Sequence, residues 1–267
     1  MEAYMNKGIK EIIDQFPEVV DILNEYDIGC GPCSVGTCLL KDIVNIHNLP
    51  ADQEQEMMAK IAQTIYPDKK IEIPRVERKT KDRPEKVTYS LPMKMLVEEH
   101  VLIKRLVALI PEIVESLDAK SEEGRQIILD TIDFIRNYAD KFHHAKEEKI
   151  LFKYFDDSLD MLQVMYEDHT QGRGHAHAIL EALDRKDETT IAKHLTAYGA
   201  LLSQHIKKED EILLPWMDRN LSISRIGKLF KEFKEADDNI GYSASTYESF
   251  IERMEAKFRY KMIRTEI

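Results

Sequence analysis

The sequence contains few of the residues that interrupt helices. Glycine occurs 10 times and proline 9 times among 267 residues, a composition that disfavours a fold of short strands joined by tight turns. Long stretches of leucine, isoleucine, methionine, glutamate and lysine favour helices instead. We therefore expect an all-α protein.

Cysteine is also scarce, and its placement argues against secretion. The 3 cysteines are an odd number and lie between Cys30 and Cys38, whereas secreted domains spread an even number of cysteines through the chain. No apolar run approaches the ~18–20 residues that span a membrane, and the N-terminus lacks a basic segment followed by an apolar one. These absences favour a reducing cytoplasm and exclude a membrane as partner.

The balance of charge disfavours another class of partner. The formal net charge is -11, and no dense block of lysine and arginine is interleaved with aromatic residues. Nucleic acid is therefore not an expected partner. None of these features specifies the oligomeric state.

Composition and periodicity divide the chain into four parts. Residues 1–66 read as a small helical domain that contains the cysteines, and residues 67–90, rich in proline and charge, read as a linker. Residues 91–217 carry apolar residues at alternating steps of three and four, which predicts four long helices in an up-down four-helix bundle. Residues 218–267 predict two extra C-terminal helices that cover the bundle or form a partner surface.

Histidine and glutamate recur at one spacing within the predicted bundle. His143 is followed four residues later by Glu147, and His205 is followed in the same way by Glu209. On a helix this spacing places the two side chains on one face, about 6 Å apart along the axis. Each pair therefore offers an imidazole and a carboxylate to one metal cluster.

A single histidine precedes each of these pairs at a similar distance. His100 lies 43 residues before His143, and His169 lies 36 residues before His205. The repeated order indicates a duplicated helical hairpin. Two such hairpins joined about a two-fold axis would bring four imidazoles and two carboxylates to one level of the bundle.

An alternative is that these six groups are buried polar side chains in an inactive core. Each would then cost several kcal/mol of desolvation, and a metal cluster removes that cost. A single zinc ion is disfavoured because six ligands exceed its tetrahedral requirement. Mixed imidazole and carboxylate ligands suit iron or manganese.

The pattern resembles the hemerythrin family in its HHE cation-binding branch, over about residues 91–217. Four segments carry the resemblance: Glu99-His100, His143 to Glu148, Asp168 to Arg173 and His205 to Asp210. The resemblance implies a hemerythrin-like bundle with a non-haem di-iron centre, oxo- or hydroxo-bridged. It implies that His100 and His143 bind one iron, that His169 and His205 bind the other, and that Glu147 and Glu209 bridge both.

The sequence departs from the oxygen-carrying members of that family. The carriers place a further histidine four residues after the third-helix ligand, where this chain has Arg173, and they end on His-x-x-x-x-Asp rather than His-x-x-x-Glu. The ligand count leaves two open positions on each octahedral iron. Reversible oxygen carriage is disfavoured, and binding of or reaction with oxygen, nitric oxide or peroxide is favoured. We expect His144, turned by about 100° from His143, to lie beside the site or at the surface.

A glycine follows the third histidine by about one turn. Gly172 lies on the inward face of its predicted helix, where glycine costs roughly 1 kcal/mol relative to alanine. One interpretation is a pocket beside the irons for a small ligand, formed by Gly172, Arg173 and Tyr198. The other is that Gly172 only allows two helices to approach closely and that Tyr198 fills the core.

The first 66 residues carry a second resemblance. Residues 9–17, 20–26 and 28–30 are similar to the small helical domains of the DUF1858 and iron–sulfur-repair N-terminal type. Cys30 and Cys33 could form a redox dithiol, and Cys38 could add a third ligand for a second metal or cluster. The alternative is three reduced structural thiols.

Two classes of function follow from these observations. One is an enzyme of stress defence or iron–sulfur repair that reduces peroxide or nitric oxide and works with a redox partner or an iron-dependent client protein. The other is a sensor of oxygen, nitric oxide or redox state that has no turnover. Iron storage is weaker, because ferritin-like centres use Glu-x-x-His and more carboxylates.

Overall fold

The computed structural model describes residues 2–26, 28, 38–41, 43, 47, 49–67, 89–240 and 244–265. Across these residues the chain is helical, and its β-structure is limited to an isolated bridge between Gly8 and Leu39. The prediction of an all-α protein is confirmed. None of the described helices combines the length and the apolar character that crossing a bilayer requires.

Contacts divide the chain into two compact units. One consists of Met1–Thr88, Ser158–Val164 and Ile212–Asn220, and the other of Tyr89–Asp157, Met165–Glu211 and Leu221–Ile267.

The N-terminal residues form short helices around a small apolar core. The described helices are α1 (Glu2–Met5), α2 (Ile9–Gln15), α3 (Val19–Glu25) and α5 (Ala51–Ile65). Ile12, Leu23, Met57 and Ile61 are fully buried in this core. Cys30 and Cys33 lie outside the described residues. Cys38 is half-buried, and its carbonyl oxygen accepts a hydrogen bond of 2.8 Å from the Ile9 amide. The roles of the three cysteines stay predictions.

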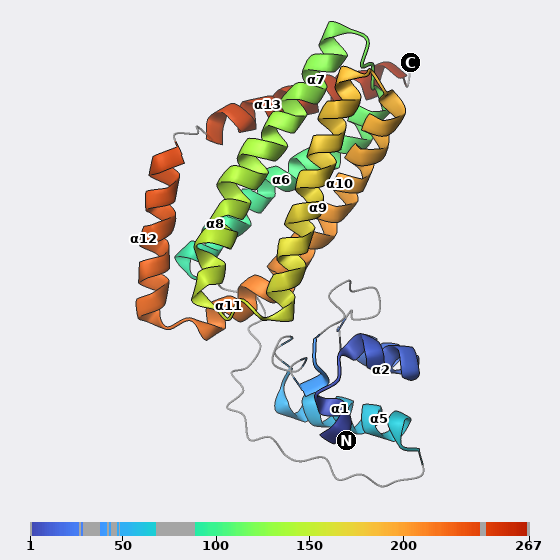
Figure 1. Cartoon of the computed structure of the whole chain (residues 1–267), viewed down its shortest axis with the longest axis vertical. Coiled ribbons are helices and arrows are strands. Elements are labelled where there is room, and N and C mark those ends of the chain that lie inside the picture. The colour runs from blue at the N-terminus through green and yellow to red at the C-terminus, as the bar shows by residue number, and fades with distance from the viewer. Residues whose placement is uncertain are drawn as a thin grey trace. The chain divides into compact units, whose positions relative to one another are not determined.

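Four long helical stretches run side by side in the second part of the chain, as Figure 1 shows. The first is α6 (Leu91–Glu115). The second consists of α7 (Glu122–Asp133), a π-helical segment η1 (Phe134–His144) and α8 (Ala145–Lys149), and a 3-10 turn η2 (Leu151–Tyr154) follows it. The third is α9 (Asp160–Asp184). The fourth consists of α10 (Glu188–Lys208), a π-helical segment η3 (Glu209–Leu213) and α11 (Leu214–Asn220).

Local sequence signals start these helices. The Ser121 hydroxyl accepts a hydrogen bond from the Gly124 amide at the start of α7, and the Asp187 carboxylate accepts one from the Thr190 amide at the start of α10. Such caps satisfy amides that have no partner within the first helical turn. Pro92 lies in the first turn of α6, where its missing amide hydrogen is not needed.

The two C-terminal helices pack on this bundle. Helix α12 (Ile223–Ile240) contacts α6, and α13 (Ala244–Thr265) contacts both α6 and η1. The Phe134 ring of η1 lies 5.6 Å from that of Tyr247 and 6.5 Å from that of Phe250, centroid to centroid. Because α13 contributes to the same apolar core as the four long helices, it is part of what holds the second helix in place.

Removing an aromatic anchor of α13 tests this account. Phe250→Ala should lower the free energy of unfolding by about 3–5 kcal/mol, because it leaves a cavity in a shared core. The neighbouring Ser249 is exposed, and Ser249→Ala should change the free energy by no more than ~0.5 kcal/mol. Denaturant titrations of both variants make the measurement. Equal stabilities would mean that α13 is dispensable for the bundle.

Candidate metal centre

The six predicted ligands meet in the interior of the bundle. Each is at most 1% exposed: His100, His143, Glu147, His169, His205 and Glu209. The imidazoles form two pairs whose Nε2 atoms face each other. These atoms lie 2.9 Å apart between His100 and His143, and 3.1 Å apart between His169 and His205.

Each carboxylate lies between one histidine of each pair. The Glu209 Oε2 atom is 3.2 Å from Nε2 of His100 and 3.3 Å from Nε2 of His205. The two oxygens of Glu147 lie 3.6 Å from Nε2 of His143 and 3.5 Å from Nε2 of His169. Both glutamates therefore stand where a carboxylate could bridge two cations.

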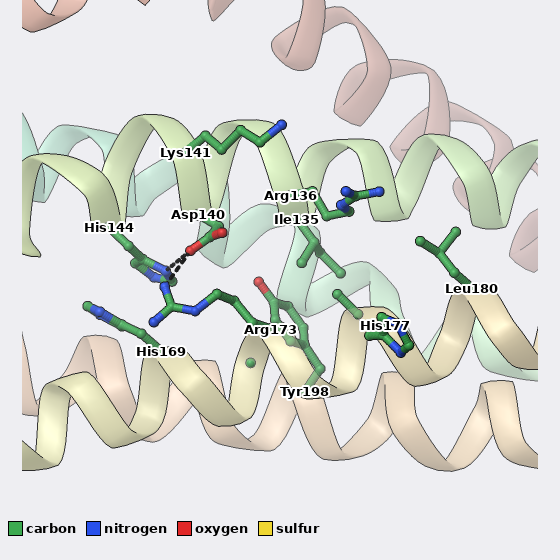
Figure 2. A pocket seen from close by; sticks show the side chains of 12 residues that line it. Ile135, Arg136, Asp140, Lys141, His144, His169, Arg173, His177, Leu180 and Tyr198 are labelled. Carbon is green, nitrogen blue, oxygen red and sulfur yellow. Dashed lines mark hydrogen bonds and ion pairs between the residues drawn. The ribbon is translucent and has the colours of Figure 1, made fainter.

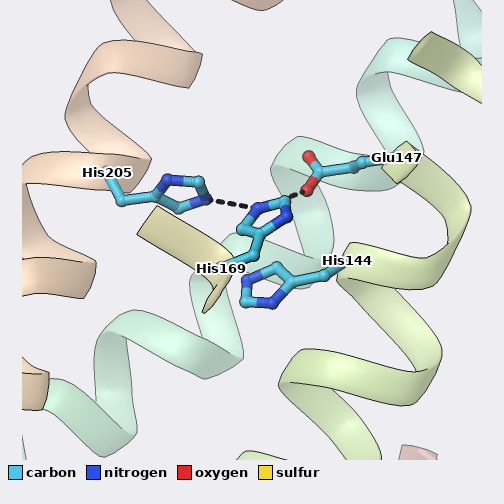
Figure 3. Close-up of side chains that lie close together, drawn as sticks. All are labelled: His144, Glu147, His169 and His205. Carbon is cyan, nitrogen blue, oxygen red and sulfur yellow. Dashed lines mark hydrogen bonds and ion pairs between the residues drawn. The ribbon is translucent and has the colours of Figure 1, made fainter. Parts of the chain in front are cut away.

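A seventh residue, His144, joins this cluster against our expectation. Its side chain is buried, and its ring stacks on His169 at a centroid distance of 3.9 Å and an interplanar angle of 13° (Figure 3). Ligand atoms of His144, Glu147, His169 and His205 all lie within 4.8 Å of one another. A second group with the same spread consists of His100, His143, Glu147 and Glu209.

The helical register explains how His144 comes within ligand distance of the cluster, which its spacing from His143 did not predict. The expected turn of 100° per residue holds for an α-helix, but His143 and His144 end the π-helical segment η1. A π-helix turns less per residue, so both histidines reach the interior. The other segment of this type, η3, begins at Glu209. Such insertions are frequent at functional sites, yet the spacing His-x-x-x-Glu alone does not reveal one.

An outer layer of carboxylates orients the four facing imidazoles. The Nδ1 atom of each lies 2.7–3.2 Å from a carboxylate oxygen, and a lysine or arginine pairs with that carboxylate. The four relays are His100–Asp210–Lys104, His143–Glu99–Lys146, His169–Glu148–Arg173 and His205–Asp168–Lys208. Donation from Nδ1–H leaves the inward Nε2 as a lone-pair ligand, an arrangement typical of metal-binding histidines.

The acidic partners follow the sequence duplication. Glu99 and Asp168 directly precede the single histidines, whereas Glu148 and Asp210 directly follow the glutamates at the centre. The two hairpins therefore support each other in the same way. The sequence shows these acidic residues next to the predicted ligands. Only the fold shows which histidine each of them contacts.

The cluster contains carboxylate oxygens and ring nitrogens for which the surrounding side chains provide no hydrogen bond. Among the described residues, no hydrogen bond reaches the carboxylate oxygens of Glu147 and Glu209 or the ring nitrogens of His144. Burial and the charge of Glu209 raise the pKa of Glu147 well above its usual range. Burial also lowers the pKa of His143 and His169, which keeps these two rings neutral. At His100 the opposite holds: although burial lowers its pKa, hydrogen bonds to Asp210 and Glu209 raise it to about 9, so a metal cation there would have to displace a proton. Neutral imidazoles and buried carboxylates fit a metal cation.

A cavity of about 300 Å³ reaches this cluster from one side. His144 and His169 belong to both the cluster and the cavity wall, and Arg173 and Tyr198 line the cavity with them (Figure 2). Gly172 is also part of this wall. A Cβ atom on Gly172 would be 3.6 Å from Cε2 of Tyr198, an ordinary contact, so two backbones do not require glycine there. The three residues of the predicted pocket thus share one cavity.

Comparison with known proteins finds a match for this part of the chain. The model of the hemerythrin HHE cation binding domain matches residues 91–217. Uncharacterized proteins of Mycobacterium bovis and Mycobacterium tuberculosis are 20% identical in alignments of 168 residues that cover 60% of this chain. The chain matches 66% of the length of these curated relatives. No solved structure matches the chain significantly.

The position of His144 yields a prediction about cation binding. His144→Ala should weaken binding of a divalent cation about tenfold or more, because it removes an imidazole from one of the two groups. His175→Ala is the matched control: this histidine of α9 pairs with His194, and its Nδ1 lies 2.9 Å from that of His194, outside the cluster. Titration of metal-free protein with ferrous iron makes the measurement. Equal affinities in the two variants would remove His144 from the ligand set.

Proposed function

We infer from the hemerythrin HHE cation binding domain at residues 91–217 that this protein holds two iron ions and binds or reacts with oxygen, nitric oxide or peroxide. The observation that carries the inference is the placement of Glu147 and Glu209. Each lies within 3.6 Å of one imidazole nitrogen from each facing histidine pair. A carboxylate in that position can bridge two cations, and two of them would give each cation an oxygen ligand from each glutamate.

The ligand set favours iron and a pair of ions. The two candidate groups share Glu147, so a cation in each would be joined through that carboxylate. Seven side chains exceed the four that a tetrahedral zinc ion takes. A mixture of imidazole and carboxylate suits iron, with manganese as the closest competitor.

His144 makes the two groups unequal. We propose that one iron is held by His100 and His143 and the other by His144, His169 and His205, with both glutamates between them. The iron on the His144 side would then have fewer positions left for solvent or ligand. In the oxygen carriers the extra histidine comes from the third helix, whereas here Arg173 stands at that point and His144 supplies the imidazole from the second helix.

The chain's own residues prepare the site for small ligands. When bound, a pair of irons supplies redox chemistry and Lewis acidity toward oxygen- and nitrogen-containing molecules. The four relays hold the imidazoles in place before any cation arrives. The apolar layers of the bundle restrict water, and the cavity beside His144 and His169 provides access. These features support reduction of peroxide or nitric oxide in stress defence.

A sensor without turnover is the second candidate, and one contact favours it. Lys146 is 1% exposed, and its ammonium group binds both Glu99, the partner of His143, and Asp237 of α12 at 2.8 Å. A change at the metal centre therefore has a direct route to the C-terminal helices. Catalytic loss of nitric oxide or peroxide in the presence of a reductant would favour the enzyme, and its absence the sensor.

The proposed role in iron–sulfur repair rests on the cysteine segment. We propose that Cys30, Cys33 and Cys38 act as a dithiol or as ligands of a second metal or cluster in a reducing cytoplasm. A redox protein or an iron-dependent client would be the partner. Support comes from the resemblance of residues 7–65 and from the half-buried position of Cys38.

The two-iron proposal predicts a stoichiometry. Anaerobic protein reconstituted with ferrous iron should saturate near two equivalents, and Glu209→Ala should lose most of that capacity because it removes an oxygen from both sites. Glu211→Ala is the matched control, since Glu211 lies in the same π-helical segment but is exposed. Iron analysis after gel filtration makes the measurement. Saturation at one equivalent, with zinc preferred, would contradict the proposal.

A further inference from the structure

The cavity beside the metal centre has a cationic rim in an acidic protein. The chain carries a formal net charge of -11. Three of the cavity's charged residues are nevertheless basic, namely Arg136, Lys141 and Arg173, and Asp140 is the one carboxylate among them. Charge of one sign around the mouth of a cavity concentrates ligands of the opposite sign and raises their rate of association.

Two of these cations have no acidic partner among the described residues. Lys141 donates a hydrogen bond of 3.0 Å to the neutral side chain of Asn137. Arg136 makes no ion pair within the described part of the chain, although Asp130 and Asp133 line a second cavity with it. Both of these acidic residues hydrogen-bond to neutral amide side chains instead of to Arg136. Asp133 accepts a hydrogen bond of 2.7 Å from Asn137, and Asp130 accepts one of 2.7 Å from Gln126.

Arg173 offsets part of the negative charge beside the cavity. Its guanidinium lies 2.8 Å from the Asp140 carboxylate (Figure 2) and 3.1 Å from that of Glu148. Because one positive charge faces two carboxylates, the excess positive charge of the cavity wall comes from Arg136 and Lys141 and not from Arg173. Since Glu148 also accepts from His169, Arg173 connects Asp140 in the cavity wall to the candidate metal centre.

The wall of the cavity offers a hydrogen-bond donor. Tyr198 is 1% exposed and lines the cavity, and its hydroxyl has no hydrogen-bond partner among the described residues. Burial and the nearby charge of Asp140 raise the pKa of Tyr198, so the hydroxyl keeps its proton. An O–H group without an acceptor in a closed space favours a ligand that can accept from it.

We propose that this cavity is an anion-selective access route to His144 and His169, in which Arg136 and Lys141 attract small monovalent anions and Tyr198 donates a hydrogen bond to them on the way. The ligand class is a small anion built of nitrogen or oxygen atoms, for which azide is the probe. The inference rests on the proposed function, because the metal pair supplies the destination. The charges at the rim would not change the association rate of a neutral diatomic molecule.

The first experiment measures association rates on iron-loaded protein. Azide binding to the oxidised form should slow by roughly tenfold in the double variant Arg136→Glu/Lys141→Glu, and the wild-type rate should fall as salt is added. Nitric oxide binding to the reduced form should change less than about twofold in either comparison, because a neutral molecule is not steered.

A matched charge reversal controls for net charge. Lys193 is exposed on α10 and is not part of the cavity wall, so Lys193→Glu should leave the azide rate nearly unchanged. Iron content is measured on every variant. Two irons in all of them, with equal azide rates at low and high salt, would overturn the anion route while leaving the proposed function intact.

A second measurement does not depend on iron. Ala176 is buried and lines the cavity, so Ala176→Cys places a thiol there in a chain whose three native cysteines are changed to serine. The ratio of its alkylation rates by iodoacetate, an anion, and iodoacetamide, a neutral analogue, cancels any change in thiol pKa. Arg136→Glu/Lys141→Glu should lower this ratio by roughly tenfold, and Lys193→Glu should not. An unchanged ratio would refute the inference even if the protein held no iron.

Discussion

The structure is organised around one buried cluster of imidazoles and carboxylates, which requires positive charge to offset the cost of its burial. Four imidazole nitrogens face one another in pairs at 2.9 and 3.1 Å, and two carboxylates lie between the pairs. Each imidazole is turned inward because its other nitrogen binds an acidic side chain, and each of those acids is held by a lysine or arginine. Cations at the centre would satisfy the lone pairs and charges that the described core otherwise leaves without partners.

Duplication explains how one chain builds such a centre. Each hairpin contributes a single histidine with an acid before it, and a His-x-x-x-Glu pair with an acid after it. Two π-helical segments adjoin the ligand pairs, one ending at His144 and one beginning at Glu209. The two halves of the centre are not equivalent, because His144 and the cavity both lie on one side of the cluster.

The sequence predicted the parts that rest on helical spacing. Six convergent residues followed from the i+4 rule and the repeated order, because a four-residue step fixes which face a side chain occupies. His144 could not be placed, since a π-helical turn changes that rule without a sequence marker. The contribution of α13 to the core could not be predicted either. An amphipathic pattern shows that one face of a helix is buried, but it does not identify the element that covers this face. The cavity around Gly172 and Tyr198 could not be predicted in full, because its wall combines residues from three helical stretches.

The account is tested most directly by the Mössbauer spectrum of protein loaded with iron-57 and then oxidised. Two irons bridged by Glu147 and Glu209, with three imidazoles on one side and two on the other, should give two quadrupole doublets of equal area. Coupling through the bridges should leave a diamagnetic ground state, so a strong applied field should add no internal magnetic splitting. A spectrum of isolated, magnetically split ferric ions would contradict the bridged pair.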